Sequence, residues 1–304
     1  PANYDAEHVQ PGKGKCKQAL QEELGLAVDP KAPLIGFVGR LVDQKGIDLV
    51  LAAMQEWAAG SEVQWAILGT GEPHYHELLS TLARRFPRKV AARLEFSDPL
   101  ARRIEAGADI FLMPSRFEPC GLNQLYSLKY GAVPLVRATG GLADTITNAT
   151  EQTLAARTAN GFSFHDYSTL ALSETLRRTC DLYLHHPEVW AQLLDTGMHQ
   201  DWSWSSSARQ YVELYGRTRA RARVLAHQSA FRVEDRSFDR RRRGGTQRDR
   251  PTRPRGRQVD RLQLRGQRAK RLLTLRMRGM RVEPHARGGE ARHAHQLAPD
   301  ARGP

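Results

Sequence analysis

PSRFEPCGLNQLYSLKYGAVPLV, residues 114–136, shows the strand–loop–helix–strand order of the chain most clearly. It follows a short apolar run at 110–113, which predicts a buried strand, and it places one carboxylate, Glu118, beyond that strand's carboxyl end. A helix is expected to begin at Gly121 and to end at Gly131. In α/β sheets the loops at this edge bind ligands, and a helix N-terminus offers backbone N–H groups. An ordinary βα turn with a solvated Glu is the alternative.

The segment SRFEPCGLNQLYSLKYG resembles the donor-site motif of bacterial glycogen synthases and plant starch synthases. These enzymes are retaining glucosyltransferases with two Rossmann-like domains, the GT-B architecture. The resemblance implies an α/β fold, a Rossmann-like parallel sheet with helices on both faces, as in the C-terminal domain of a GT-B fold. Other retaining GT-B enzymes carry a second Glu eight residues after the first. Here that position is Tyr126, which fits the glycogen and starch synthases better.

Two cations flank the turn after the strand predicted at 34–38. The sequence there reads GRLVDQKGIDLVLAAM, with Arg40 and Lys45 ahead of an amphipathic helix. A planar Arg fork and a Lys point charge together suit a diphosphate, and a solvated basic turn is the alternative. Glycogen synthases carry a similar G-R-L-x-x-Q-K-G motif. The resemblance implies that Arg40 and Lys45 hold the phosphates of a nucleotide sugar and stabilise the leaving diphosphate.

A glycine-bearing turn follows the strand predicted at 63–68. Gly69, Thr70 and Gly71 form this turn, and paired glycines allow a backbone to approach a ligand closely. A plain tight turn is the alternative. The run ILGTGEP is similar to the corresponding segment of the glycogen synthases, which implies that this loop lies near the nucleotide.

An aromatic residue ends the strand predicted at 90–96. This residue is Phe96, and Asp98 is expected to cap the helix that follows. In the resembling family an aromatic at this position stacks on adenine, so the resemblance implies that Phe96 contacts the base. A core Phe is the alternative.

A Gly-Gly pair in RATGGLADTI begins another helix at a strand end, where bare N–H groups face an anion. The resemblance implies that four residues lie by the donor's phosphates: Thr139, Gly140, Gly141 and Leu142. It also implies that Glu118 holds the glucose hydroxyls in a pocket shaped by three neighbours: Cys120, Gly121 and Leu122.

No metal ion or cofactor is expected. The chain has no D-x-D motif, and His74 and His76, at i and i+2, do not share a helix face. The segment GKGKCK at 12–17 lacks the spacing of a phosphate loop and is expected to lead into a helix ending near Gly25. The resemblance implies that two cations replace a metal and that ADP-glucose is a substrate.

Three cysteines without C-x-x-C spacing indicate reduced thiols and a cytoplasmic setting. Neither a signal peptide nor a membrane-spanning helix is expected. The sequence gives no indication of oligomeric state or of glucan length preference.

The net charge of +13 is unevenly distributed. Residues 1–224 hold 24 Lys and Arg against 25 Asp and Glu, so the excess lies in residues 225–304. We expect three parts: a nucleotide-sugar-binding domain at 1–199, a helix at 200–224 that in the family crosses to the N-terminal domain, and a disordered Arg-rich tail at 225–304.

Two interpretations of the tail compete. A basic nucleic-acid-binding tail would interleave aromatics with its charge, and residues 225–304 hold only Phe231 and Phe238. A translated stretch outside the natural frame is the other interpretation, because GC-rich codons give an Arg, Gly, Pro and Ala bias. We favour a functionless tail, so nucleic acid is not expected as a partner.

The resemblance covers residues 1–221 and implies the donor-binding half of a glycogen synthase. The K-x-G-G loop of the family's N-terminal half does not occur here. The implied reaction transfers glucose from ADP-glucose to the non-reducing 4-hydroxyl of an α-1,4-glucan with retention. Without its N-terminal half such a site should bind the donor yet lack the positioning that catalysis needs. A transferase for another nucleotide sugar is the closest alternative.

Overall fold

The computed structural model describes residues 2–242 of the 304. Its centre is a six-stranded, wholly parallel sheet with the spatial order β3-β2-β1-β4-β5-β6. The strands are β1 (Leu34–Val38), β2 (Gln64–Leu68), β3 (Val90–Arg93), β4 (Ile110–Met113), β5 (Val133–Arg137) and β6 (Phe162–Phe164). The strand order reverses between β1 and β4, which creates a crevice at the carboxyl edge of the sheet. The predicted Rossmann-like sheet is confirmed.

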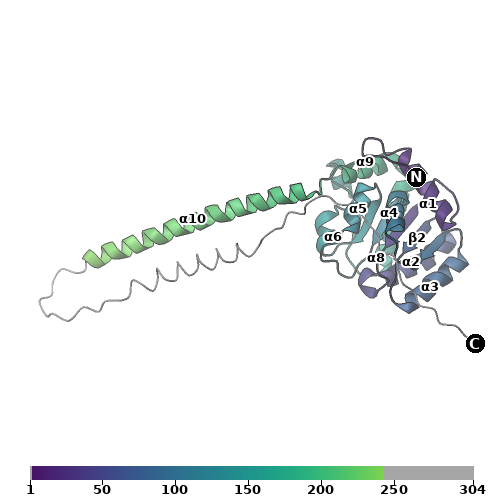
Figure 1. Ribbon diagram of the computed structural model, residues 1–304, viewed down its shortest axis with the longest axis horizontal. Coiled ribbons are helices and arrows are strands. Elements are labelled where there is room, and N and C mark those ends of the chain that lie inside the picture. Colours follow the sequence, from purple (N-terminus) through teal and green to yellow (C-terminus); the bar gives the residue numbers. More distant parts are fainter. Residues whose placement is uncertain (1, 243–304) are drawn as a thin grey trace, which may run out of the picture. The chain divides into compact units, whose positions relative to one another are not determined.

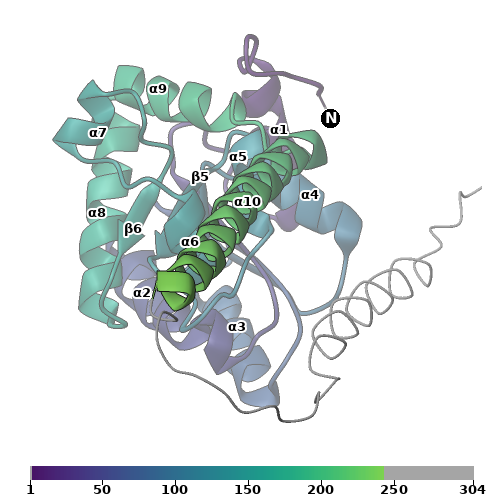
Figure 2. The same ribbon diagram turned by 90° about the vertical axis from the view of Figure 1, so that its left-hand side faces the viewer.

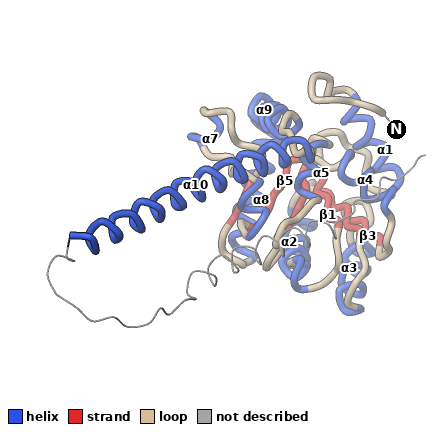
Figure 3. Tube along the Cα trace, turned by 60° about the vertical axis from the view of Figure 1, so that its left-hand side comes forward, coloured by secondary structure: helices blue, strands red, loops and turns tan. Residues whose placement is uncertain are grey.

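Helices cover both faces of the sheet, as Figures 1 and 2 show. The helices before β5 are α1 (Gly12–Leu24), η1 (Asp43–Lys45), α2 (Ile47–Gly60), α3 (Pro73–Arg85), α4 (Asp98–Gly107) and α5 (Asn123–Lys129). Those after β5 are α6 (Gly140–Thr145), α7 (Glu151–Ala155), α8 (Thr169–His185), α9 (Pro187–Met198) and α10 (Trp204–Arg242). In Figure 3 the red strands lie between α4 on one side and α2 on the other.

Two apolar clusters hold these layers together. Ile35 and Phe37 of β1 point to one face of the sheet and pack in the cluster that includes Trp65 and helix α2. Leu34, one residue earlier, points to the opposite face and packs with Ile104 of α4. Because side chains alternate along a strand, one buried strand contributes to both clusters. The loops that carry the chemistry therefore rest on a sheet that is buried on both faces.

The strand predicted at 90–96 is shorter than expected. β3 ends at Arg93, whose partner across the ladder is Leu68, the last residue of β2. Because β3 is an edge strand with no other neighbour, pairing stops where β2 stops. Phe96 therefore lies in a loop, 88% exposed, and the alternative of a core Phe is wrong.

The cap of α4 also differs from the prediction. The hydroxyl of Ser97 accepts a hydrogen bond from the Leu100 N–H at 3.3 Å, so Ser97 is the N-cap and Asp98 lies in the first turn. Helix α5 begins two residues later than predicted, at Asn123, and ends before Gly131, whose φ of 62° few other residues adopt.

Helix α10 extends further than predicted. It runs from Trp204 to Arg242 and so passes the end predicted at 224 and includes 225–242 of the predicted tail. Residues 243–304 lie outside the described part of the chain, and the predicted disorder there stays a prediction. Residues Pro1–Ala222 form one compact unit. Across the described residues, every helix is too short or too polar to traverse a lipid bilayer.

Candidate active site

The site lies at the carboxyl edge of the sheet, where β1 and β4 diverge. Lys45 ends the short helix η1 after β1, and Glu118 lies in the loop after β4. The Lys45 Nζ atom contacts Glu118 Oε2 at 2.5 Å. The Ser115 hydroxyl donates to the same carboxylate oxygen at 3.2 Å. Two residues that the sequence predicted independently therefore form one charged pair, and Ser115 is a third member that the prediction missed.

Arg40 reaches the same loop through an intermediary. Its Nη2 atom donates to the side-chain oxygen of Gln44 at 2.7 Å, and the Gln44 amide nitrogen donates to the Phe117 carbonyl at 3.3 Å. The Arg116 N–H also donates to the Gln44 carbonyl at 2.9 Å. The loop that carries Glu118 is thus tied to the turn that carries both predicted cations. Gln44 belongs to the G-R-L-x-x-Q-K-G motif, so its position was visible in the sequence.

A second group of contacts holds the loop that carries Glu118, residues 114–122, which we call the acid loop. The guanidinium of Arg116 binds Asp48 at 2.9 Å and lies over the ring of Tyr167, 4.3 Å from its centroid. Arg137 donates to the Arg116 carbonyl at 2.8 Å. The Tyr167 hydroxyl donates to Asp48 at 2.5 Å. These bonds fix the chain at Arg116, between Ser115 and Glu118, and so preorganise the Glu118 carboxylate.

Two cavities open beside this loop. The larger, about 610 Å³, runs from the end of β1 along α4 to α5, and four of the predicted donor-binding residues line it: Arg40, Gly69, Thr70 and Phe96. The smaller, about 90 Å³, is lined by Lys45, Ser115 and Glu118, with Gly121 and Leu122. Both cavities share Val38, Gly39 and Asn123 in their walls, so they adjoin.

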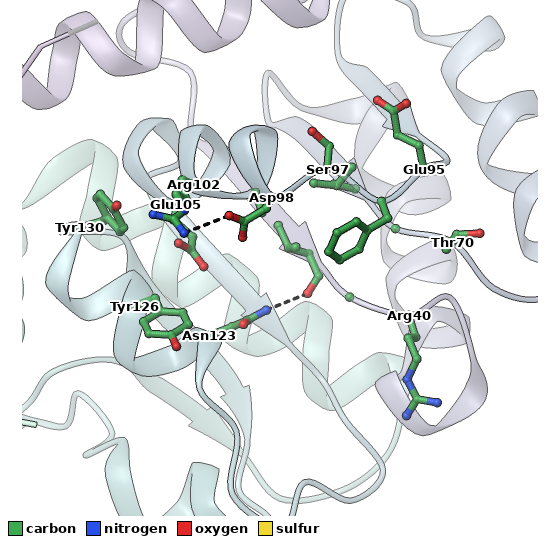
Figure 4. Close-up of a pocket in the computed structure, with 16 residues that line it drawn as sticks. Arg40, Thr70, Glu95, Ser97, Asp98, Arg102, Glu105, Asn123, Tyr126 and Tyr130 are labelled. Carbon is green, nitrogen blue, oxygen red and sulfur yellow. Dashed lines mark hydrogen bonds and ion pairs between the residues drawn. The ribbon is translucent and has the colours of Figure 1, made fainter. Parts of the chain in front are cut away.

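The larger cavity has a wall that the sequence analysis did not assign. Figure 4 shows Asp98, Arg102 and Glu105 on α4, with Asn123 and Tyr126 of α5 and the following Tyr130 also on the cavity wall. Arg102 pairs with Asp98 at 2.9 Å, and the Asn123 amide donates to the Val38 carbonyl at 3.0 Å. Leu122 and Tyr126 are both about half exposed, so part of the apolar surface of α5 faces this site and not the core.

The glycines after β2 approach another backbone. A Cβ at Gly69 would lie 1.9 Å from the Gly39 carbonyl oxygen, and one at Gly71 would lie 2.2 Å from that of Leu41. The loops after β1 and β2 continue to pair beyond the strands, since the Leu41 N–H donates to the Thr70 carbonyl at 3.0 Å. This close pairing alone requires glycine, so these glycines carry no independent indication of a ligand.

The Gly-Gly turn before α6 packs against the acid loop. Gly140, at φ +46°, leaves no room for a side chain beside the Glu118 carbonyl, and the Gly141 N–H donates to that carbonyl at 3.1 Å. The Leu142 N–H donates to the Thr139 carbonyl at 3.1 Å, and the Leu142 side chain is buried in the core. The expectation of bare N–H groups is therefore wrong for Gly141 and Leu142. Thr139 and Cys120 line neither cavity, and their predicted roles stay predictions.

The fold and this arrangement match the glycosyl transferases. A family model described as "Glycosyl transferases group 1" matches residues 22–192. Because this match spans more than half of the chain, the chain belongs to that family.

The relatives place it more narrowly within the family. The chain is 49% identical over 217 residues to glycogen synthase of Rhodopirellula baltica, which is 71% of this chain and 43% of the relative. It is 48% identical over 214 residues to glycogen synthase of Thioalkalivibrio sulfidiphilus. The chain therefore spans less than half the length of these curated relatives, and the resemblance to glycogen synthases is confirmed for the part it spans.

Solved structures agree with the fold. The catalytic domain of starch synthase IV from Arabidopsis thaliana, bound to ADP and acarbose, has a TM-score of 0.64 at 35% identity, over 71% of this chain and 44% of that one. Anabaena HepE in complex with UDP and glucose has a TM-score of 0.51 at 15% identity, which supports the fold alone.

Proposed function

We propose that this chain supplies the donor-binding half of an ADP-glucose-dependent glucan synthase. The observation that carries the proposal is the Lys45–Glu118 pair in the small cavity, adjoining a larger cavity rimmed by Phe96. A nucleotide sugar has three matching parts: a flat base, a diphosphate and a hydroxyl-rich ring. In this proposal the base and ribose occupy the larger cavity and the glucose occupies the smaller.

The reaction requires stabilisation of negative charge, because this charge grows on the leaving diphosphate. Lys45 and Arg40 supply fixed positive charge beside the shared wall of the two cavities. In the free protein the Lys45 ammonium is held by Glu118, and a diphosphate would replace that carboxylate as its partner. Glu118 is then released to accept hydrogen bonds from glucose hydroxyls and to stabilise positive charge on the ring. No metal ion or cofactor is assigned a step.

The acceptor is the second substrate. We propose an α-1,4-glucan, extended at its non-reducing 4-hydroxyl with retention of configuration, on the resemblance to the glycogen synthases and on the acarbose in the starch synthase IV structure. We further propose that transfer requires the part of the relatives' length that this chain does not match, because a site with one wall cannot orient an acceptor.

Calorimetry with ADP, ADP-glucose and UDP-glucose on the whole chain tests the proposal. We expect ADP and ADP-glucose to bind more tightly than UDP-glucose, and Arg40→Ala and Lys45→Ala to weaken both adenine ligands. Lys31→Ala is the matched control, since Lys31 is exposed just before β1, at the other edge of the sheet. Equal binding of ADP and UDP-glucose would support the alternative of another nucleotide sugar.

A further inference from the structure

The wall of the larger cavity includes a carboxyl group that the proposed reaction does not use. Glu105 lies on α4 and lines this cavity, yet the residue is only 4% exposed. Among the described residues its carboxylate has no hydrogen bond and no ion pair. Figure 4 shows it below α4, on the side of the cavity where Asn123 and Tyr126 lie. A buried carboxylate without a partner is costly, so its place on a cavity wall calls for an explanation.

The charged groups around Glu105 do not neutralise it. Arg102 on the same helix pairs with Asp98, and Glu95 in the preceding loop is a further acid on the cavity wall. From α1, the Lys13 ammonium reaches the Glu105 main-chain carbonyl at 3.4 Å, where it also binds the carbonyls of Ala106, Ala108 and Tyr130. From α5 the cavity receives the uncharged side chains of Asn123 and Tyr126, and Tyr130 follows directly after that helix.

Burial keeps this carboxyl partly protonated near neutral pH. Desolvation raises the pKa of Glu105 from 4.5 to about 7, Arg102 lowers it and Asp98 raises it. A protonated carboxyl presents one O–H donor beside one C=O acceptor. This pairs with a planar ring whose edge carries an acceptor nitrogen next to an amino group, as adenine does. An ionised carboxylate presents two acceptors and instead suits guanine, whose edge carries two adjacent N–H donors.

We propose that Glu105 recognises the base of the nucleotide sugar as a neutral acid, donating to a ring nitrogen of adenine and accepting from its amino group. The proposal rests on the proposed function. The spacing along α4 leaves room for a base between the start of the helix and Glu105. Asp98 and Glu105 are seven residues apart, which is about 10 Å at a rise of 1.5 Å per residue. A base that enters beside the exposed ring of Phe96, near the start of α4, extends its edge along the helix toward Glu105. Glu105 is thereby a specificity-determining residue.

The test is the ratio of ADP affinity to GDP affinity as a function of pH, measured by calorimetry on the full chain. The two ligands carry the same diphosphate, so ionisation of the phosphates cancels in the ratio. Between pH 6 and pH 8 we expect this ratio to fall about 10- to 100-fold. For a group of pKa near 7 the protonated fraction, which favours ADP, falls about tenfold, and the ionised fraction, which suits GDP, rises by the same factor.

Two variants separate recognition from folding. Glu105→Gln keeps one donor and one acceptor, so ADP should bind as tightly as to the wild type at pH 6, with a ratio independent of pH. Glu105→Met removes both groups, and ADP should bind weakly at every pH. Glu62→Gln, an exposed carboxylate paired with Lys89, is the matched control and should keep the wild-type profile. Melting curves verify that each variant is folded.

The outcomes distinguish the two proposals. ADP binding that depends on Lys45 but shows a pH-independent ADP-to-GDP ratio overturns the role of Glu105 and leaves the proposed function standing. The same conclusion follows if Glu105→Gln keeps the wild-type pH dependence, since Lys13, whose pKa burial lowers to about 8, would then be the titrating group. Absence of ADP binding at every pH overturns both proposals.

Discussion

Two Lys–carboxylate pairs occupy opposite edges of the same sheet, and they differ in what surrounds them. At the amino edge, Lys17 binds Asp109 at 2.7 Å, and these side chains are 5% and 9% exposed. At the carboxyl edge, Lys45 binds Glu118 at 2.5 Å, and the exposures are 23% and 9%. The Lys17–Asp109 pair is buried within the fold, and we call it the sealed pair. The Lys45–Glu118 pair faces a cavity, and we call it the open pair.

The remaining partners explain the difference. The Lys17 ammonium also donates to the carbonyls of Pro30 and Ala32 and to the hydroxyl of Tyr183, and Asp109 accepts from the Leu34 N–H at 2.9 Å. A group with all its hydrogen bonds satisfied inside the fold has no bond to offer a ligand. Lys45 has Glu118 as its one side-chain partner within the described residues. Removing one partner of a buried pair leaves an uncompensated charge in the fold, whereas a half-open pair is able to exchange partners.

The largest effect is expected at the sealed pair. Asp109→Ala should destabilise the chain by about 3–5 kcal/mol, because it leaves a buried ammonium without its counter-charge. Urea unfolding measures this. Glu62→Ala, which removes an exposed partner of Lys89, is the control and should cost less than about 1 kcal/mol. Equal, small losses for both variants would contradict the structural role of the Asp109 pair.

The open pair should affect ligand binding more than stability. Lys45→Met should weaken ADP binding about 10- to 100-fold, since hydrogen bonds to charged groups are worth about 1.5–3 kcal/mol. Lys17→Met should lower the melting temperature and leave the ADP affinity of the folded fraction unchanged. Calorimetry and thermal unfolding of the two variants measure the contrast, and a loss of affinity in Lys17→Met alone would reverse it.

The pH dependence of stability should reveal the third buried carboxyl. Because burial raises the pKa of Glu105 to about 7, the folded chain keeps a proton that the unfolded chain releases above pH 4.5. This contribution to stability is complete below about pH 4.5 and is lost as the pH rises through 7. Glu105→Gln should therefore be more stable than the wild type at pH 8, by about 1–3 kcal/mol, and the difference should shrink at pH 5. Urea unfolding at the two pH values measures it, and an equal difference at both would contradict the assignment.

The smallest expected effect is at Gln44, which joins Arg40 to the acid loop. Gln44→Met keeps the length of the side chain and removes both amide bonds, and it should weaken ADP binding about two- to fivefold, the value of a partly exposed hydrogen bond. In the Arg40→Ala background the same change should have no further effect, because its action runs through Arg40. Calorimetry on the four variants measures the coupling, and additive losses would assign Gln44 a separate role.

The sequence predicted the sheet and the place of the charged residues well. Apolar runs locate strand ends, so Arg40, Lys45 and Glu118 were correctly expected at the carboxyl edge. Their contact could not be predicted from periodicity, since it depends on β1 and β4 being neighbours. The segment at 12–17 begins the predicted helix, and two of its three lysines, Lys13 and Lys17, are buried against carbonyls and Asp109.

The remaining errors have local physical causes. Glu105 is a charged residue in a helix that also carries Arg102 and Arg103, and only the packing of other elements around α4 makes it buried. Gly69 and Gly71 suggested a ligand, although the backbone of the adjacent loop already requires them. Residue type alone does not distinguish these causes.

A crystal structure of the chain with ADP tests the central claim most directly. We predict the diphosphate within hydrogen-bonding distance of Lys45 Nζ and the Arg40 guanidinium, with the Lys45–Glu118 distance longer than the 2.5 Å of the free protein. A diphosphate bound elsewhere, for example at the amino edge beside Lys15, or one bound while Lys45 still contacts Glu118 and Arg40 stays on Gln44, would contradict it.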